Sequence, residues 1–114
     1  MQRAGGSSGD ELVSVAPGLV DVTDRVLYGE VWERSDKLAQ RDRCLVTLSA
    51  IIATNHLDRL ESHLRLALRS GLTVEELGEA ILQLAFYSGW PNAVGAARIL
   101  YNIDEAMKQE EAGD

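Results

Sequence analysis

The segment CLVTLSAIIAT, residues 44–54, limits more than any other what this chain can fold into. It follows the charged triplet Arg-Asp-Arg of residues 41–43, and it is apolar or small on every side of a helix. A helix of this kind has to be surrounded by other elements. We therefore predict a helix over residues 39–54 that is buried all round, in a fold that packs further helices against it.

One further helix is predicted before this segment and one after it. No stretch has the pattern of a strand. The first covers about residues 23–34, with Asp21 or Thr23 as its N-cap. The other covers residues 57–70 and ends at Gly71, which suits the position just after a helix C-terminus.

The clearest start signal in the chain lies at Thr73 and Glu76, which form a T-x-x-E capping box. The helix that begins there is expected to end at Gly89, and Pro91 suits the first turn of a last helix. Small residues in this last helix would let another helix approach closely: Ala93, Gly95, Ala96 and Ala97.

Five helices with short connections predict an all-α, compact antiparallel bundle, a single domain over residues 19–110. Residues 1–18 are rich in Gly and Ser and end in Pro-Gly, so we expect a flexible N-terminal tail, and residues 111–114 a C-terminal one. One small bundle cannot easily bury both helix 39–54 and the leucines on two sides of helix 57–70. We therefore expect a homo-oligomer.

Charge and cysteine content narrow the function classes. A formal net charge of −7 argues against nucleic acids and anionic membranes as partners. An anionic small molecule is compatible with it, because a pocket can be locally basic. Cys44 is the single cysteine, which excludes an intramolecular disulfide and a Cys-x-x-Cys pair. Residues 1–18 do not resemble a signal peptide, and residues 44–56 are too short to span a bilayer, so we expect a cytoplasmic protein.

His63, in the stretch ESHLRLALRSG, is one of two histidines. At about 100° per residue it falls between a stripe of leucines and Leu66, which places it near a helix–helix or subunit seam. A lone histidine at such a seam is usually a packing residue, and the working group of a site is the alternative. A metal site is not expected, because no cysteine or carboxylate completes a ligand set with His56 and His63.

Glu30 lies in YGEVWE, next to Gly29 and close to Trp32. Its plain interpretation is a solvated face, and its alternative is a desolvated carboxylate poised for proton transfer. Gly29 weakens a helix by about 1 kcal/mol relative to Ala, so a packing or functional reason for it is expected. The neighbours of Cys44 predict a buried, inert thiol.

Arg41 and Arg43 lie near a helix start, where the helix dipole disfavours positive charge. They are expected either to pair with Asp42 or Glu33 or to receive an anionic substrate. Tyr87 and Trp90 lie on the two sides of the SGWP break, where an aromatic pair is usually structural but can also line a pocket.

Together these segments resemble the carboxymuconolactone decarboxylase family. Its pattern combines G-[DE]-x-W, R-[DT]-R-[ST]-L-[VI]-T, H-L-x-x-A-x-x-x-G-x-T-x-x-E-[IL] and Y-x-G-x-P-x-A, in the order and spacing found over about residues 28–97. The matching positions are Gly29, Glu30, Trp32, Arg41, Arg43, Leu45, Thr47, His63, Leu64, Gly71, Thr73, Glu76, Tyr87, Gly89, Pro91 and Ala93.

The resemblance implies an all-α subunit in a ring-like homo-oligomer, a trimer or hexamer, without metal or organic cofactor. It implies an enzyme that removes CO₂ from 4-carboxymuconolactone to give an enol-lactone in the catabolism of aromatic compounds. His63 would then be catalytic, with Glu30 orienting or reprotonating it, and Arg41 or Arg43 would hold a substrate carboxylate. The residues expected to line the substrate pocket with them are Trp32, Tyr87 and Trp90.

Two departures from the family keep alternatives open. Lactone decarboxylases of the family carry a longer N-terminal region and a histidine at the position of Val26. The hydroperoxide-reducing (AhpD-like) branch carries a cysteine pair where this chain has His56 and Arg59, so its dithiol chemistry is absent. The alternatives are a relative that catalyses another cofactor-free proton transfer or cyclisation on a carbonyl compound, and a non-catalytic oligomeric binding protein.

Overall fold

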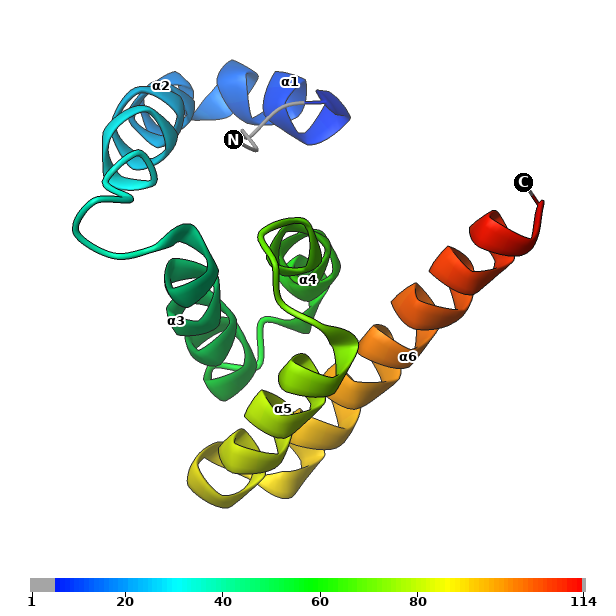
Figure 1. Cartoon of the computed structure of the whole chain (residues 1–114). Coiled ribbons are helices and arrows are strands. Elements are labelled where there is room, and N and C mark those ends of the chain that lie inside the picture. The colour runs from blue at the N-terminus through cyan, green and yellow to red at the C-terminus, as the bar shows by residue number, and fades with distance from the viewer. Residues whose placement is uncertain (1–5, 114) are drawn as a thin grey trace. The chain divides into compact units, whose positions relative to one another are not determined.

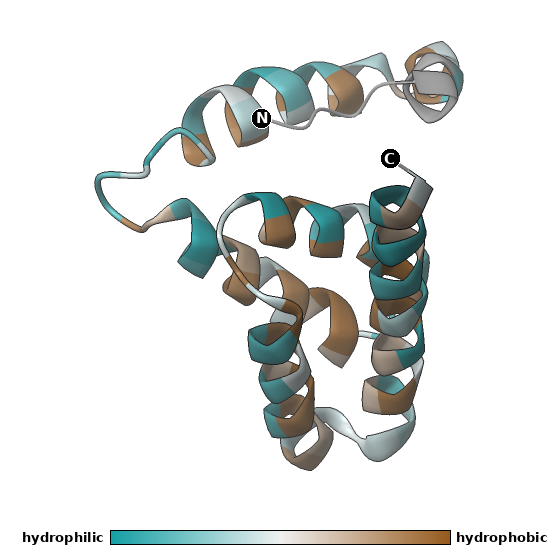
Figure 2. Cartoon of the chain, turned by 45° about the vertical axis from the view of Figure 1, so that its right-hand side comes forward, coloured by the Kyte–Doolittle hydropathy of each residue, from teal (hydrophilic) through white to brown (hydrophobic). Residues whose placement is uncertain are grey.

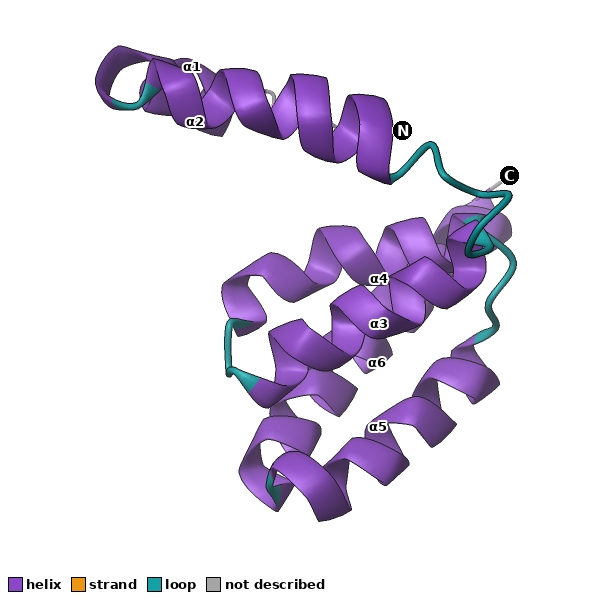
Figure 3. Ribbon diagram, turned by 90° about the vertical axis from the view of Figure 1, so that its left-hand side faces the viewer, coloured by secondary structure: helices purple, strands orange, loops and turns teal. Residues whose placement is uncertain are grey.

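A computed structural model of the chain describes residues 6–113, with side chains from residue 11 onward. Over these residues it contains six α-helices, one π-helix and one 3₁₀-helix, and no strand (Figure 3). The predicted all-α class is therefore confirmed. The chain divides into two compact units, with the boundary between Gln40 and Arg41. The single domain over residues 19–110 stays a prediction.

The first unit contains α1 (Gly6–Val15), α2 (Pro17–Val22) and the π-helix η1 (Thr23–Val31). Residues expected to form a flexible tail, 1–18, thus include the whole of α1 and the start of α2. Residues 1–5 of this tail lie outside the described part of the chain. Its mobility stays a prediction.

The N-cap predicted at Asp21 or Thr23 is wrong, because both residues lie inside a continuous helical run that begins at Pro17. The Thr23 hydroxyl donates back to the carbonyl of Leu19, 2.7 Å away, and the Asp21 carboxylate pairs with Arg25 at 3.3 Å. Pro17 opens the helix, since the first helical position needs no N–H donor.

The helix predicted over residues 23–34 is a π-helix and ends at Val31. The Trp32 N–H donates to the carbonyl of Leu27, five residues back, at 2.9 Å. A Cβ atom on Gly29 would lie 3.2 Å from the carbonyl oxygen of Asp24, which is a tight contact. Because Asp24 belongs to the same π-helix, this close approach gives a steric reason within the helix for the glycine.

The helices predicted in the second unit are all present, with ends close to those expected. The Thr73 side chain accepts from the backbone N–H of Glu76, and Glu76 accepts from that of Thr73, so the capping box is confirmed. Gly71 and Gly89 have φ values of 106° and 105°, which a side chain would oppose. The elements are α3 (Gln40–Ala53), η2 (Leu57–Arg59), α4 (Leu60–Arg69), α5 (Val74–Ser88) and α6 (Trp90–Gly113).

Helices α5 and α6 lie side by side and antiparallel, joined by the tight turn at Gly89 (Figure 1). Helix α6 also contacts α4. A Cβ atom on Gly95 would lie 2.6 Å from the Leu57 side chain, so this small residue does permit a close approach. Apolar segments recur along each helix of the unit (Figure 2), and the largest fully buried side chains are Ile52, Leu60, Leu64, Leu77 and Ile103.

Helix α3 is not buried all round within the second unit, contrary to the prediction. Cys44, Leu48 and Ile52, which follow one another at intervals of four residues, are buried. On another side of the same helix, Val46 is 62% exposed. The core of the second unit therefore covers one side of α3 and leaves another open.

Candidate functional site

His63 lies in the middle of α4, between two sets of core residues. Leu60, Leu64 and Ala67 are buried on one side of it and Leu66 is buried on the other. The imidazole itself is half-buried. This burial pattern is the one that the helical spacing predicts, and a seam between helices or subunits at His63 stays a prediction.

Two features distinguish this imidazole from an ordinary packing histidine. Its Nδ1 atom is buried and has no hydrogen-bond partner in the part of the chain that the structure describes. A buried polar atom without a partner costs about 1–3 kcal/mol and calls for an explanation. Burial lowers the pKa of His63, and the positive charge of Arg59 lowers this pKa further. The neutral form of the imidazole is therefore favoured over the charged form at neutral pH.

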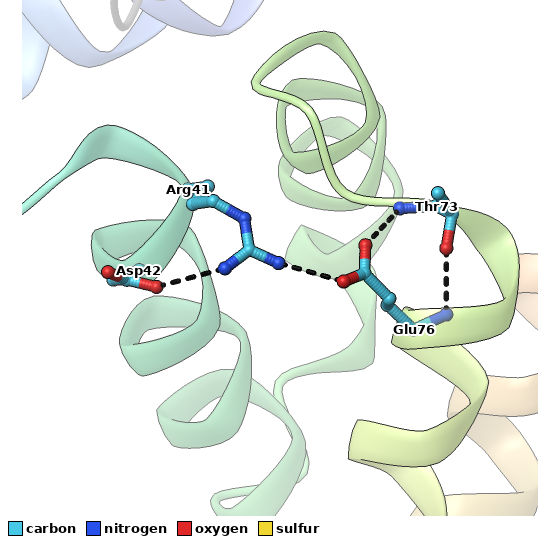
Figure 4. Close-up of polar contacts among 4 residues, drawn as sticks. All are labelled: Arg41, Asp42, Thr73 and Glu76. Carbon is cyan, nitrogen blue, oxygen red and sulfur yellow. Dashed lines mark hydrogen bonds and ion pairs between the residues drawn. The ribbon is translucent and has the colours of Figure 1, made fainter.

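Arg41, a predicted substrate-binding residue, is held by two carboxylates (Figure 4). Its Nη2 atom donates to Oε2 of Glu76 at 2.9 Å, and its Nη1 atom lies 3.4 Å from Oδ1 of Asp42. The other oxygen of Glu76, Oε1, accepts from the backbone N–H of Thr73 at 3.0 Å. Glu76 thus fixes the start of α5 and the orientation of Arg41 with one carboxylate.

Arg43 and Cys44 occupy the next positions of the same helix. The Arg43 side chain is partly buried. Cys44 is buried, and its sulfur lies 3.8 Å from the Ser70 hydroxyl oxygen. Burial raises the pKa of the Cys44 thiol, and the Ser70 contact only partly offsets this. A protonated, buried thiol agrees with the prediction of an inert side chain.

Glu30 and Trp32 belong to the first unit. The Glu30 side chain, at the end of η1, is exposed. Trp32 follows η1 directly and is 4% exposed. A pairing of Glu30 with His63 stays a prediction.

Tyr87 and Trp90 are both exposed, to 81% and 57%. Trp90 meets Phe86 edge to face, with ring centroids 5.8 Å apart. It also lines a groove of about 230 Å³ between α5 and α6. The other residues of this groove, mostly small or aliphatic, are Gly78, Ile81, Leu82, Ala85, Ala93, Val94 and Ala97.

The described residues also bear on metal binding and on membrane insertion. No three His, Cys, Asp or Glu side chains within residues 6–113 are grouped so that they could hold a metal ion. None of the helices in the same range is both long enough and apolar enough to cross a membrane.

Two residues have a partner that the sequence did not predict. Glu76 is predicted only as part of the capping box, because nothing in the sequence relates it to Arg41, thirty-five residues earlier. The effect of Arg59 on His63 is not predicted either, although the spacing of four residues was a signal for a charge one helical turn away.

Comparison with known proteins agrees with the motifs of the chain. The sequence model of the carboxymuconolactone decarboxylase family matches residues 17–101, a longer stretch than the motifs cover. The nitrosuccinic acid decarboxylase of Metarhizium robertsii is 38% identical over 69 residues, which are 60% of this chain and 48% of the fungal protein. The chain thus spans about half the length of this curated relative.

Proposed function

Because the chain belongs to the carboxymuconolactone decarboxylase family, we propose that it is a decarboxylase that works without a metal or organic cofactor. Its proposed substrate is 4-carboxymuconolactone or a related carboxylated lactone, converted to an enol-lactone in the catabolism of aromatic compounds. The observation that carries the proposal is His63, a half-buried, neutral imidazole with a buried ring nitrogen that no described residue satisfies.

The chemistry of such a substrate explains why no cofactor is needed. The bond between the ring carbon and the carboxylate breaks, CO₂ leaves, and the electron pair moves through the conjugated system to the lactone carbonyl oxygen. A proton then adds to carbon and gives the product. The enzyme has to stabilise charge at the oxygen, supply the proton and keep water away from the departing carboxylate.

His63 suits these tasks in two stages. As a neutral imidazole it can donate one hydrogen bond to the oxygen that becomes negative. An anionic substrate beside it raises its pKa, because a nearby negative charge favours the protonated ring. The same side chain can then take up a proton and pass it to the substrate carbon. In the free protein, the lowered pKa of His63 favours the neutral ring.

Arg41 and Arg43 supply the positive charge for the substrate carboxylate in this proposal. Arg41 does so as a guanidinium whose direction Glu76 already fixes, so that little side-chain entropy is lost on binding. Glu30 would orient His63 or reprotonate it, and Trp32, Tyr87 and Trp90 would line the pocket. The name of the fungal relative supports decarboxylation of a small acid in general.

We also propose that the protein works as a homo-oligomer, a ring of three or six copies. A second copy would cover large apolar side chains that a single chain leaves in water. In α5 and α6 these exposed side chains are Leu82, Phe86, Tyr87, Trp90, Val94 and Tyr101. Such contact would also close a pocket wall around Tyr87 and Trp90.

Turnover of 4-carboxymuconolactone, followed by its ultraviolet absorbance, tests the reaction. His63→Asn should reduce the rate about 10²–10⁴-fold, as the loss of a general acid–base group does. His56→Asn is the matched control, because the His56 side chain is exposed and its Nδ1 atom lies 2.7 Å from the Thr54 hydroxyl oxygen. It should leave the rate unchanged.

Nitrosuccinic acid should be assayed in parallel. If only nitrosuccinic acid is turned over, the protein is a decarboxylase of acyclic acids and the proposed lactone substrate is wrong. If neither acid is turned over while cyclic carbonyl compounds are isomerised, the decarboxylase proposal is wrong. The alternative, another proton-transfer reaction on a carbonyl compound, then takes its place. An equal rate in the His63→Asn and His56→Asn variants would refute the role of His63.

Sedimentation of the intact chain tests the assembly. Leu82→Glu places a charge on the exposed face of α5, where Leu82 is 50% exposed, and should shift the distribution to single chains. Glu79→Gln, at another exposed position of α5, is the control. A wild-type chain that sediments as a monomer at micromolar concentration would contradict the proposed oligomer.

A further inference from the structure

A second pocket, apart from His63, lies between α4 and α6. It has a volume of about 260 Å³ and is lined by Arg65, Leu68, Arg69 and Met107. Two positive charges and two apolar side chains thus share one small cavity, and none of its lining residues is a carboxylate.

The two guanidinium groups keep much of their capacity to bind an anion. Arg65 uses its Nε atom to bind Oε2 of Glu61 at 3.2 Å, and the Glu61 side chain is 64% exposed. Arg69 is exposed and makes no hydrogen bond or ion pair with any residue within the described range 6–113. Arg69 lies in the last turn of α4, where the helix dipole stabilises a positive charge. That interaction uses none of its N–H donors.

This pocket does not belong to the candidate catalytic site. Arg65 and Arg69 follow His63 by two and six positions, which puts them about 160° and about 120° away around the helix axis. His63 points between core residues, whereas Arg65 and Arg69 point to the opposite side of α4, where Met107 of α6 adds to the pocket wall. A ligand in this pocket therefore cannot be in contact with the imidazole.

From this arrangement we infer that the cavity between α4 and α6 binds a short-chain organic anion. Its carboxylate pairs with Arg65 and Arg69, and its hydrocarbon part lies against Leu68 and Met107. The volume holds roughly eight non-hydrogen atoms if each takes about 30 Å³, the share of a water molecule. Hexanoate has this size. The inference does not depend on the proposed reaction.

Methionine labelling provides a direct readout. The chain has two methionines, Met1 and Met107, so a protein with ¹³C-labelled methionine methyl groups gives two signals. Met107→Leu assigns the signal of the pocket. Titration with hexanoate should move the Met107 signal and saturate. Hexanamide, which has the same number of non-hydrogen atoms and no charge, should bind about ten-fold more weakly, because it loses the charge-assisted hydrogen bonds.

Variants separate this pocket from other binding sites. The double variant Arg65→Gln, Arg69→Gln should bind hexanoate as weakly as hexanamide. Arg98→Gln, at an exposed arginine elsewhere on α6, should bind it as the wild type does. Equal affinity for the two ligands, no saturable shift, or loss of the shift in His63→Asn would overturn the inference. The comparison of the two ligands on the wild-type protein decides it even if the double variant does not fold.

Discussion

The two halves of the second unit differ in what they expose. Residues 41–70, which form most of α3 and all of α4, carry five arginines against three acidic side chains. Residues 71–114 carry Arg98 and Lys108 against eight acidic side chains. The first half holds the half-buried His63, and the second exposes aromatic side chains such as Phe86, at 74%. The difference suggests that α3 and α4 supply the chemistry, and α5 and α6 a surface for assembly.

Replacing one leucine in each half tests this division most strongly. Leu64→Ala removes a side chain that is 1% exposed and should lower the free energy of unfolding by about 2–5 kcal/mol. Leu82→Ala removes one that is 50% exposed and should change the stability of a single chain by less than about 0.5 kcal/mol. Chemical denaturation at a fixed chain concentration measures both.

The dependence of the denaturation midpoints on chain concentration tests whether the second half of the unit forms a surface for assembly. If Leu82 lies at a contact between copies, its loss should reduce the rise of the midpoint with chain concentration. Leu64→Ala should leave that rise in place. A Leu82→Ala variant that is destabilised as much as Leu64→Ala at every concentration would show that Leu82 belongs to the core of one chain.

Within this second unit the sequence predicted most of the fold. The starts and ends of its helices follow local physical rules, which depend only on neighbouring residues. The residues that set them are Gly71, Thr73, Gly89 and Pro91. In the first unit the same kind of reasoning failed at Thr23, whose hydroxyl bonds back to Leu19 instead of capping a helix. The choice between an α-helix and a π-helix depends on small differences in packing that the sequence pattern does not record.

The ion pair that joins the two halves offers a smaller test. Thr73→Ala removes the N-cap of α5 and should cost about 1 kcal/mol of unfolding free energy. Glu76→Gln keeps a side chain that can accept from the Thr73 N–H, but it loses the ion pair with Arg41. Because the two side chains of that pair are 42% and 47% exposed, the cost should be between zero and about 1 kcal/mol.

Kinetics separate the structural and functional effects of these variants. Under the proposed function, Glu76→Gln frees Arg41 from its fixed direction and should raise KM for the substrate more than it lowers kcat. Thr73→Ala is the matched control, because it weakens the same helix start and leaves Arg41 paired. Equal changes in KM for the two variants would show that Glu76 acts only as part of the helix cap.

Gly78 provides a test with the opposite sign. It lies inside α5 and lines the groove between α5 and α6, and a Cβ atom there would meet nothing within 4 Å. Gly78→Ala should therefore raise the free energy of unfolding of a single chain by about 0.5–1 kcal/mol. If the groove receives another copy, the added methyl group should at the same time weaken self-association, which sedimentation measures.

The candidate site was harder to predict than the fold. The helical spacing placed His63 at a seam, and the family resemblance made it the catalytic candidate. The sequence could not reveal that Nδ1 has no partner among the described residues, because that depends on which atoms other helices bring close. Nor could it show that Arg41 is bound to Glu76, a contact between distant segments. Side-chain partners across helices follow from packing, and packing has no local signal.

The smallest expected effect concerns the proton affinity of His63. Its pKa in the folded protein is lowered, chiefly by burial and then by Arg59, so the unfolded chain binds the proton more tightly. Its contribution to stability is therefore fully present above a pH of about 6.5, the ordinary value, and is lost as the pH falls through the lowered pKa. His63→Asn should show a shallower loss of stability in that acid range than the wild type.

Arg59→Gln divides this effect between its two causes. Removing the positive charge should move the pKa of His63 part of the way back towards the ordinary value, and burial should account for the larger remaining shift. Proton NMR of the imidazole, assigned with His63→Asn, measures both pKa values directly. A wild-type His63 that titrates at or above about 6.5 would mean that a partner satisfies the ring in solution. Residues 41–70 would then no longer differ from residues 71–114 by holding a desolvated imidazole.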